Sequence, residues 1–325
     1  MDRQGAVAAL QRAVATFVSE HAASEQRWCV ALSGGPDSLA LTAVAASLKP
    51  TTALIVDHRL QPGSEVVAAA ARDHAKALGC VDAQVLCVEV GTAGGPEAAA
   101  RAARYRALDG ARGDAPVLLA HTLDDQAETV LLGLGRGSGA RSIAGMKPCD
   151  PPWYRPLLGV RRSDTHAACA ELGLTAWRDP HNADRRFTRA RLRNEVLPLL
   201  EEVLGGGVAE ALARTATALR EDTAALDELA QRALADVRAG KNGIAGGLDV
   251  AWLAALPDAI RRRVIRGWLL AGGASDLTDK QIRGVASLVT AWRGQGGVAV
   301  GSPLRSRRLI AGRRNGTLTL HTEPV

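Results

Sequence analysis

The chain has 325 residues, long enough for two domains of about 100 to 200 residues each. Hydrophobic residues make up 47% of it and the mean hydropathy is close to zero, which excludes a largely disordered chain. The net charge of +6 and the pI near 9.4 come largely from arginine, whose guanidinium suits phosphate, so the composition allows nucleic acid as a partner.

The first part of the chain alternates helix and strand patterns. Apolar residues three and four apart indicate an opening amphipathic helix: Val7, Leu10, Val14 and Phe17. Strand-like apolar runs lie at 28–32, 52–56, 84–90 and 116–120, each followed by a helical pattern, at 39–48, 64–78, 96–111 and from about 123. This alternation predicts an α/β fold, a Rossmann-like parallel sheet with helices on both faces. Ligands of such sheets bind beyond the carboxyl ends of the strands.

The later part of the chain loses this alternation. Glycine and proline are frequent in residues 135–156, which predicts a lid or a linker. Helices are predicted at 208–239, 257–270 and 278–292, and two short strands at 307–311 and 317–320 predict a hairpin that turns at Asn315-Gly316. We therefore expect two domains, residues 1–204 with the sheet and residues 205–325, mostly helical, with a C-terminal hairpin.

The cysteines and the N-terminal segment bear on the cellular compartment. The five cysteines are scattered, odd in number and without a C-x-x-C pair, which disfavours a disulfide framework and a zinc ribbon. No N-terminal apolar run reaches the length of a signal core or a membrane span. We expect a cytoplasmic protein with no membrane partner.

A glycine-rich turn joins the first predicted strand to its helix, with the sequence Ser33-Gly34-Gly35-Pro36-Asp37-Ser38. Adjacent glycines let backbone N–H groups approach a ligand closely, and the positive end of the helix dipole favours phosphate. The alternative is a plain connection in which Ser33 or Ser38 only caps the helix. No Gly-Lys-Ser/Thr follows, so the turn is not a Walker A loop.

A second polar cluster, residues 120–129, follows the fourth strand and contains Asp125 and Glu128. Carboxylates three apart lie on one face of a helix, where both could reach phosphate-bound Mg²⁺. Thr122 followed by Asp125 also fits a capping box, which would explain Asp125 by helix stability alone. We favour metal binding, because capping leaves Glu128 and His121 unexplained.

Two further positions suit a nucleotide. Asp57-His58 ends the second strand, where the base and ribose would lie in such a sheet. Arg101 and Arg104 share one helical face, although a basic face is often only solvated.

Taken together, the motifs resemble the tRNA(Ile)-lysidine synthetases, a family of PP-loop ATP pyrophosphatases. The resemblance covers about the first 200 residues and rests on residues 33–38, Asp57-His58-Arg59-Leu60, Arg101-Ala102-Ala103-Arg104-Tyr105, residues 121–129, Arg136-Gly137-Ser138-Gly139, Gly145-Met146, Arg155-Pro156-Leu157-Leu158, Asp179-Pro180-His181-Asn182 and the basic stretch 187–198. Two positions depart from the family pattern: Ala190 stands in place of Asn, and His181 stands where Ser is common. We expect a short form of the family, without the further C-terminal domain of its longer members.

The resemblance implies a reaction. ATP adenylates the carbonyl oxygen at carbon 2 of the wobble cytidine in an isoleucine tRNA with a CAU anticodon, and pyrophosphate leaves. The side-chain amine of L-lysine then displaces AMP. Lysine must lose a proton before it attacks, since its reference pKa is about 10.4, and His121 is one candidate base, with a neutral contact role as the alternative.

The resemblance also implies roles for individual residues. The catalytic set is Asp37, His121, Asp125, Glu128 and Arg189. ATP would contact Ser33, Gly34, Gly35, Pro36, Asp37, Ser38, Asp57, His58 and Arg104, and Mg²⁺ would bind Asp125 and Glu128. The tRNA would contact Arg136, Arg189, Arg191 and Arg193, and residues 205–325 would form a tRNA-binding domain. A basic C-terminal group, Arg305, Arg307, Arg308, Arg313 and Arg314, could also follow the tRNA backbone.

Two other functions compete with this hypothesis. A PP-loop tRNA thiolase would need a reactive cysteine pair, which the five dispersed cysteines fit poorly. A non-catalytic adenine-nucleotide-binding module would keep the glycine turn but would not need Asp125, Glu128 or a basic second domain. The sequence leaves the oligomeric state open, with a homodimer as one alternative.

Overall fold

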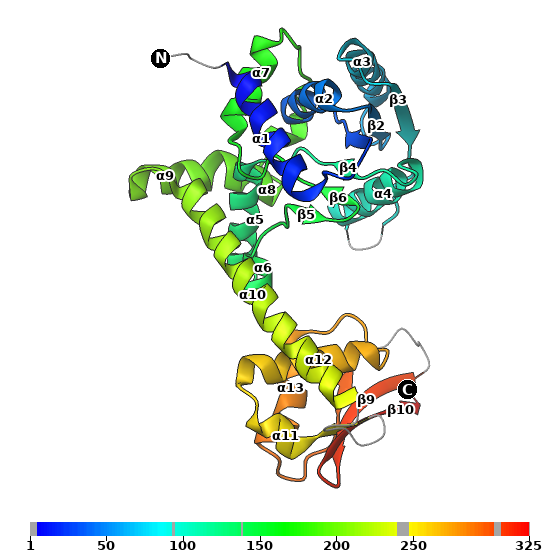
Figure 1. Ribbon diagram of the computed structural model, residues 1–325, viewed down its shortest axis with the longest axis vertical. Helices are drawn as coiled ribbons and strands as arrows, with labels where there is room; N and C mark the ends of the chain where they lie inside the picture. Colours follow the sequence, from blue (N-terminus) through cyan, green and yellow to red (C-terminus); the bar gives the residue numbers. More distant parts are fainter. Residues whose placement is uncertain (1–4, 93–94, 138, 239–246, 302–306, 325) are drawn as a thin grey trace. The chain divides into compact units, whose positions relative to one another are not determined.

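The computed structural model describes residues 5–92, 95–137, 139–238, 247–301 and 307–324. They form two compact units, residues 1–217 and 218–325 (Figure 1). Helix α10 (Val208–Arg238) runs through the division, and the domain boundary expected after residue 204 stays a prediction. Ser138 and Arg305, which belong to the predicted motifs, lie outside the described residues.

The first unit is built on a six-stranded sheet with the order β3-β2-β1-β4-β6-β5. Its strands are β1 (Trp28–Ala31), β2 (Thr51–Asp57), β3 (Asp82–Cys87), β4 (Val117–Leu118), β5 (Cys149–Asp150) and β6 (Trp153–Tyr154). All neighbouring pairs are parallel except β5 and β6. The four parallel strands predicted from apolar runs are present, whereas β5 and β6 are two residues long and lie in the stretch predicted as a lid or linker.

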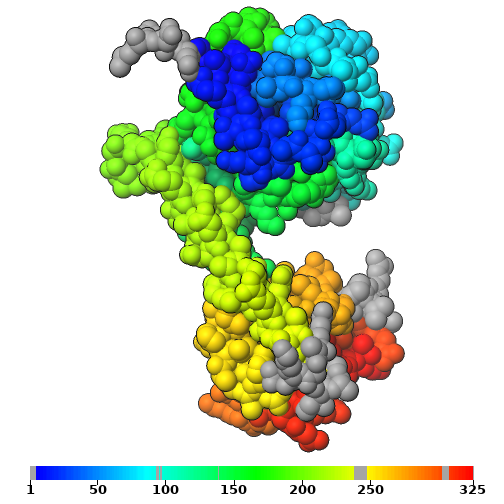
Figure 2. All heavy atoms as spheres, viewed as in Figure 1, coloured from blue at the N-terminus to red at the C-terminus, as the bar shows by residue number. Residues whose placement is uncertain are grey.

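Helices cover both faces of this sheet, which confirms the predicted fold class. The α-helices of the first unit are α1 (Ala6–His21), α2 (Pro36–Leu48), α3 (Ser64–Ala77), α4 (Pro96–Ala111), α5 (Leu123–Gly135), α6 (Ala140–Ile143), α7 (Arg162–Glu171), α8 (Thr188–Arg191) and α9 (Leu197–Leu204). A 3-10 helix, η1 (Pro180–Ala183), and a π-helix, η2 (Leu192–Val196), are also present. α1 runs across the face of the unit seen in Figure 2 and buries Leu10, Val14 and Phe17 of its predicted stripe.

Successive residues of β1 point to opposite faces of the sheet and so enter two cores. Val30 packs in the core that α1, α2, α3 and α7 build. Cys29 and Ala31 pack on the other face with Leu108 of α4. Because both faces are covered, the strands read as continuous apolar runs in the sequence.

The sheet has its topological switch point between β1 and β4. The chain passes from β1 through β2 to β3 on one side, and β4 then pairs with the free side of β1. Ligands of open α/β sheets bind beyond the carboxyl ends of the strands at such a point. Residues 33–38 follow β1 and His121 follows β4, so the fold brings the two predicted motifs to the same edge.

The second unit combines helices with a four-stranded antiparallel sheet of order β7-β10-β9-β8. Its elements are β7 (Leu248–Asp249), α11 (Val250–Ala255), α12 (Asp258–Ala271), α13 (Asp279–Thr290), β8 (Val298–Val300), β9 (Arg307–Arg314) and β10 (Thr317–Pro324). β9 and β10 form a hairpin whose turn residues, Asn315 and Gly316, both have positive φ, as the Asn-Gly pair predicts. The sequence did not predict β7 and β8, whose two and three residues are too few for a pattern. The described helices of the chain contain no apolar stretch of the length that a membrane span requires.

Candidate active site

The turn at residues 33–38 is closed by its own hydrogen bonds. The Ser38 hydroxyl donates to the Gly35 carbonyl oxygen at 2.9 Å and accepts from the Ser33 backbone N–H at 3.2 Å. Gly34 has a φ of 82°, in the left-handed region that favours glycine. The N-cap residue of α2 is Gly35, which has no side chain to cap the helix, and no cap is supplied within the described part of the chain. The serines therefore shape the turn and do not cap the helix, which leaves the start of α2 suited to phosphate.

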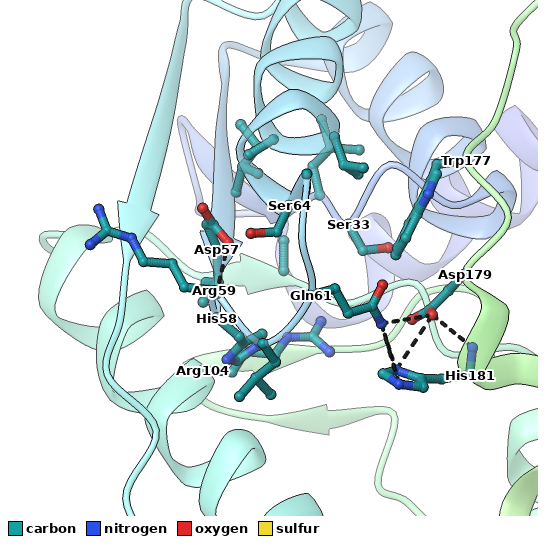
Figure 3. Close-up of a pocket in the computed structure, with 18 of the residues that line it drawn as sticks. Ser33, Asp57, His58, Arg59, Gln61, Ser64, Arg104, Trp177, Asp179 and His181 are labelled. Atoms are coloured by element: carbon teal, nitrogen blue, oxygen red, sulfur yellow. Dashed lines mark hydrogen bonds and ion pairs between the residues drawn. The ribbon is translucent and has the colours of Figure 1, made fainter. Parts of the chain in front are cut away.

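A cavity of about 410 Å³ opens beside this turn, within the size range of small-molecule sites. Strand ends of β1 and β2 form its apolar floor, including Ala31, Leu54 and Val56. Its polar rim, shown in Figure 3, includes four of the nine residues predicted to contact ATP: Ser33, Asp57, His58 and Arg104. Pro36 and Asp37, also predicted to contact ATP, line a different cavity.

Two loops join across the mouth of this cavity through Gln61. Its amide nitrogen lies 3.3 Å from Asp179 Oδ1 and 2.7 Å from His181 Nδ1 (Figure 3). Asp179 also accepts the His181 backbone N–H at 2.9 Å and thereby caps η1. The segment that carries Asp179 also contacts the glycine-rich turn, because the Trp177 backbone N–H donates to the Gly34 carbonyl oxygen at 2.9 Å. We call the Gln61, Asp179 and His181 contacts the clasp.

Asp125 and Glu128, the predicted metal ligands, lie side by side on α5 and face arginines. Arg162 Nη2 donates to Asp125 Oδ1 at 2.7 Å and to Glu128 Oε1 at 3.2 Å. Arg193 donates to the same two carboxylates at 2.8 to 3.2 Å. The Glu128 side chain is 0% exposed, so these arginines take the place of water as partners of its carboxylate. We call these four residues, together with Asp37 and Arg189, the carboxylate–arginine cluster.

The capping box that competed with metal binding is present. Asp125 Oδ2 accepts the Thr122 backbone N–H at 2.8 Å, and the Thr122 hydroxyl accepts the Asp125 backbone N–H at 3.4 Å. Only one Asp125 oxygen caps, however, and Oδ1 faces the arginines. Burial alone would raise the pKa of Asp125, but Arg162 and the Thr122 N–H outweigh burial and lower it. Asp125 therefore both caps α5 and keeps an ionised oxygen for the site.

Asp37 connects the turn to this cluster. The Thr165 hydroxyl donates to Asp37 Oδ1, and Arg162 Nε lies 3.7 Å from Asp37 Oδ2. Burial raises the pKa of Asp37, although Thr165 and Arg162 oppose that rise. A second cavity of about 860 Å³ adjoins Asp37, and its lining includes Arg162, His166, Asp179 and Arg193. Trp177 lines both cavities.

His121 is half-buried and flanked by arginines. Burial is the main cause that lowers its pKa to about 3, and Arg104 and Arg155 add to the effect, while Asp125 opposes it. The buried His121 Nδ1 makes no hydrogen bond to any residue that the structure describes. His121 is therefore a neutral imidazole at neutral pH and a poor base in the free protein, which favours a contact role over proton abstraction.

The four arginines predicted to contact tRNA lie in different settings. Arg136 follows α5 as its C-cap residue and is exposed. Arg189 Nη1 donates to the Thr129 hydroxyl at 3.3 Å, and Arg191 pairs with Glu195 at 3.3 Å. The Arg193 side chain belongs to the carboxylate–arginine cluster, where it donates to Asp125 and Glu128. In the C-terminal group, Arg313 donates to the Leu288 carbonyl oxygen at 2.9 Å, so it also has a structural partner at the end of α13.

Sequence reasoning missed Arg162, Gln61 and Trp177. Arg162 starts α7, far along the chain from the acids it contacts, and no local pattern links them. One signal was available: a helix with Asp124, Asp125 and Glu128 close together needs counter-charges, and Arg161 and Arg162 follow shortly after the Arg155-Pro156-Leu157-Leu158 motif.

Among the described residues, no group of three or more His, Cys, Asp or Glu side chains is arranged to hold a metal ion.

Comparison with known proteins settles the family. A PP-loop domain model matches residues 7–200, and a TilS substrate binding domain model matches residues 248–318. A tRNA(Ile)-lysidine synthase of Mycobacterium tuberculosis (strain ATCC 25618 / H37Rv) is 73% identical over the full length of both chains. The chain belongs to the tRNA(Ile)-lysidine synthase family. Other similar members come from Mycobacterium leprae, 70% identical over the full length of both chains, and Rhodococcus erythropolis, 63% identical over 92% of this chain and 90% of the relative.

The family membership confirms the resemblance found in the motifs and does not favour either competing function. A solved structure of the U34-tRNA thiolase NcsA from Methanococcus maripaludis is also similar, with a TM-score of 0.55. It covers 66% of this chain and 80% of the thiolase at 16% identity, so the likeness shows a shared fold alone. The second competing function, a non-catalytic nucleotide-binding module, would not need the carboxylate–arginine cluster.

Proposed function

We propose that this chain uses ATP to activate the wobble cytidine of an isoleucine tRNA with a CAU anticodon and joins the side-chain amine of L-lysine to carbon 2. The observation that carries the proposal is the carboxylate–arginine cluster, which lies beside the PP-loop turn at the switch point of the sheet. The full-length similarity to tRNA(Ile)-lysidine synthases supports it.

In the first half of the reaction, the cytidine carbonyl oxygen attacks the α-phosphorus of ATP and pyrophosphate leaves. The N–H groups of residues 33–38 would bind the phosphates, and Asp57, His58 and Arg104 would line the nucleoside part of the cavity. The oxygens of Asp125 and Glu128 suit Mg²⁺, which prefers one or two carboxylates plus phosphate. Bound there, Mg²⁺ would neutralise charge on the phosphates. Arg189 and Arg193, at the same carboxylates, would add positive charge toward the leaving pyrophosphate.

In the second half, the lysine amine attacks carbon 2 and AMP leaves with the former carbonyl oxygen. The cavity of about 860 Å³ offers a place for lysine, with Asp37 and Asp179 for an ammonium and Arg178 for a carboxylate. We favour Asp37 over His121 as the group that takes the amine proton, because burial raises the pKa of Asp37 while His121 has a pKa of about 3. His121 would contribute a neutral hydrogen bond.

The tRNA would be held by arginines of both domains. We propose that Arg136, Arg189, Arg191 and Arg193 contact its backbone or the wobble nucleotide, and that residues 205–325 form the tRNA-binding domain. The match of residues 248–318 to a substrate binding domain supports this part. We further propose that the protein acts in the cytoplasm, where tRNA and ATP are available, and as a homodimer, which light scattering of the purified protein would test.

A direct experiment tests the proposed function. The protein is incubated with Mg-ATP, labelled L-lysine and a CAU-anticodon isoleucine tRNA, and label in the tRNA is counted. We expect incorporation that requires both ATP and the cognate tRNA, together with AMP release. ATP binding without incorporation would instead favour the nucleotide-binding module.

A further inference from the structure

One guanidinium bridges three carboxylates of the carboxylate–arginine cluster. Arg162 Nη2 contacts Asp125 and Glu128 at 2.7 and 3.2 Å, and Arg162 Nε lies 3.7 Å from Asp37. The Arg162 side chain is 16% exposed, and its buried Nε makes no hydrogen bond to the residues that the structure describes. Arg162 therefore ties the PP-loop turn, through Asp37, to both carboxylates that would bind Mg²⁺.

The charges of the cluster already balance. Its three carboxylates are Asp37, Asp125 and Glu128, and its three guanidinium groups are Arg162, Arg189 and Arg193. A divalent cation that entered alone would meet guanidinium groups in hydrogen-bonding contact with the oxygens it needs. Since the Glu128 carboxylate is buried and Arg162 and Asp125 are mostly so, repulsion between the cation and Arg162 is screened less than at the surface.

The phosphates of ATP would change this balance. A triphosphate adds several negative charges and offers a guanidinium planar, paired acceptors of the kind it binds best. Asp37 belongs to the turn that would hold these phosphates, so Arg162 needs only a side-chain movement to exchange carboxylate partners for phosphate partners.

We propose that Arg162 is, with Arg193, a resident counter-ion of the metal site, which weakens the binding of free Mg²⁺ at Asp125 and Glu128 until the phosphates of ATP take the Arg162 guanidinium. Arg162 is in this sense a positioning residue, and the metal enters together with the nucleotide. The inference rests on the proposed function, because it takes Asp125 and Glu128 as the Mg²⁺ ligands.

Metal binding without nucleotide tests the inference. Mn²⁺, which shares oxygen ligands with Mg²⁺, is titrated into the protein and followed by electron paramagnetic resonance, with no ATP, lysine or tRNA present. We expect Arg162→Ala to bind Mn²⁺ at least about tenfold more tightly than the unsubstituted protein, or about 1.4 kcal/mol. Arg162→Lys, which keeps the charge, should remain near the unsubstituted protein.

Two controls locate the effect. Arg161→Ala removes the neighbouring arginine, which pairs with Asp124 and Glu210 and not with the metal carboxylates, so Mn²⁺ affinity should not change. The double substitution Arg162→Ala with Glu128→Gln should lose the gained affinity. Circular dichroism verifies the fold of each variant, and Arg162→Gln replaces Arg162→Ala if the alanine variant does not fold.

Either of two results would overturn the inference. One is a folded Arg162→Ala or Arg162→Gln variant that binds Mn²⁺ no more tightly than the unsubstituted protein. The other is a gain that survives Glu128→Gln. Because the assay contains no lysine or tRNA, its failure is distinct from failure of the proposed function, which would show as absent lysine incorporation by the unsubstituted protein.

Discussion

At the scale of single residues, Glu128 is the acid on which the carboxylate–arginine cluster depends most. It is fully buried and accepts hydrogen bonds from Arg162 and Arg193. The spacing of Asp125 and Glu128 on one helix could be read from the sequence, because helical periodicity is local. Their arginine partners could not, because α7 and η2 come together with α5 only in the folded chain.

Glu128→Gln should therefore damage both activity and stability. Removing one charge from a buried ion cluster leaves arginines without their partner, which costs about 3 to 5 kcal/mol. Chemical denaturation measures the free energy of unfolding, and pyrophosphate release measures activity. The matched control is Glu210→Gln, which breaks a more exposed pair with Arg161 and should cost no more than about 1 kcal/mol. Equal losses in both variants would show that Glu128 has no special role.

His121 should make the protein sensitive to acid. In the unfolded chain its pKa is near the ordinary 6.5, whereas in the folded chain it is about 3. Between these values the unfolded state binds more protons, so the free energy of unfolding falls as pH drops from about 6.5 toward 3. His121→Asn should reduce this fall, measured by urea denaturation at several pH values. An identical pH dependence in the variant would contradict the low pKa.

At the scale of elements, the sequence predicted the helices and strands that are long or have a regular hydrophobic pattern. The four main strands and their helices were found, because buried parallel strands are continuous apolar runs and helices repeat every three to four residues. The two-residue strands β5 and β6 and the short strands β7 and β8 were not, since their positions depend on pairing partners distant in sequence. The clasp was also hidden, because Gln61 and His181 meet only across the cavity.

Opening the clasp should speed nucleotide release. Gln61→Ala removes the contacts that join the two loops over the cavity, one to the Asp179 carboxylate and one to the His181 ring, and their loss of about 1.5 kcal/mol corresponds to roughly tenfold in the dissociation rate. Stopped-flow fluorescence with a labelled ATP analogue measures that rate. Gln84→Ala, which removes a surface contact with Asp82 on β3, is the control and should leave it unchanged. Release at the original rate from Gln61→Ala would mean that the clasp does not retain nucleotide.

At the scale of the whole molecule, binding of tRNA is expected to be strongly electrostatic. The chain carries a net charge of +6, and arginines are found in the predicted contacts of the first domain and on β9 of the second. The logarithm of the tRNA association constant should fall with the logarithm of salt concentration, with a slope of about 0.7 to 0.9 per phosphate neutralised. Filter binding over a range of salt concentrations measures the slope, and Arg191→Ala should reduce it by about one phosphate. A flat dependence would exclude a backbone-contacting surface.

The most direct measurement of the central claim is the identity of the modified nucleoside. After incubation with Mg-ATP, lysine and the CAU-anticodon isoleucine tRNA, the tRNA is digested to nucleosides and analysed by mass spectrometry. We predict that the wobble cytidine gains the mass of lysine less one water, and that Glu128→Gln abolishes this gain. An unmodified cytidine at that position, from protein that binds both ATP and the tRNA, would contradict the account.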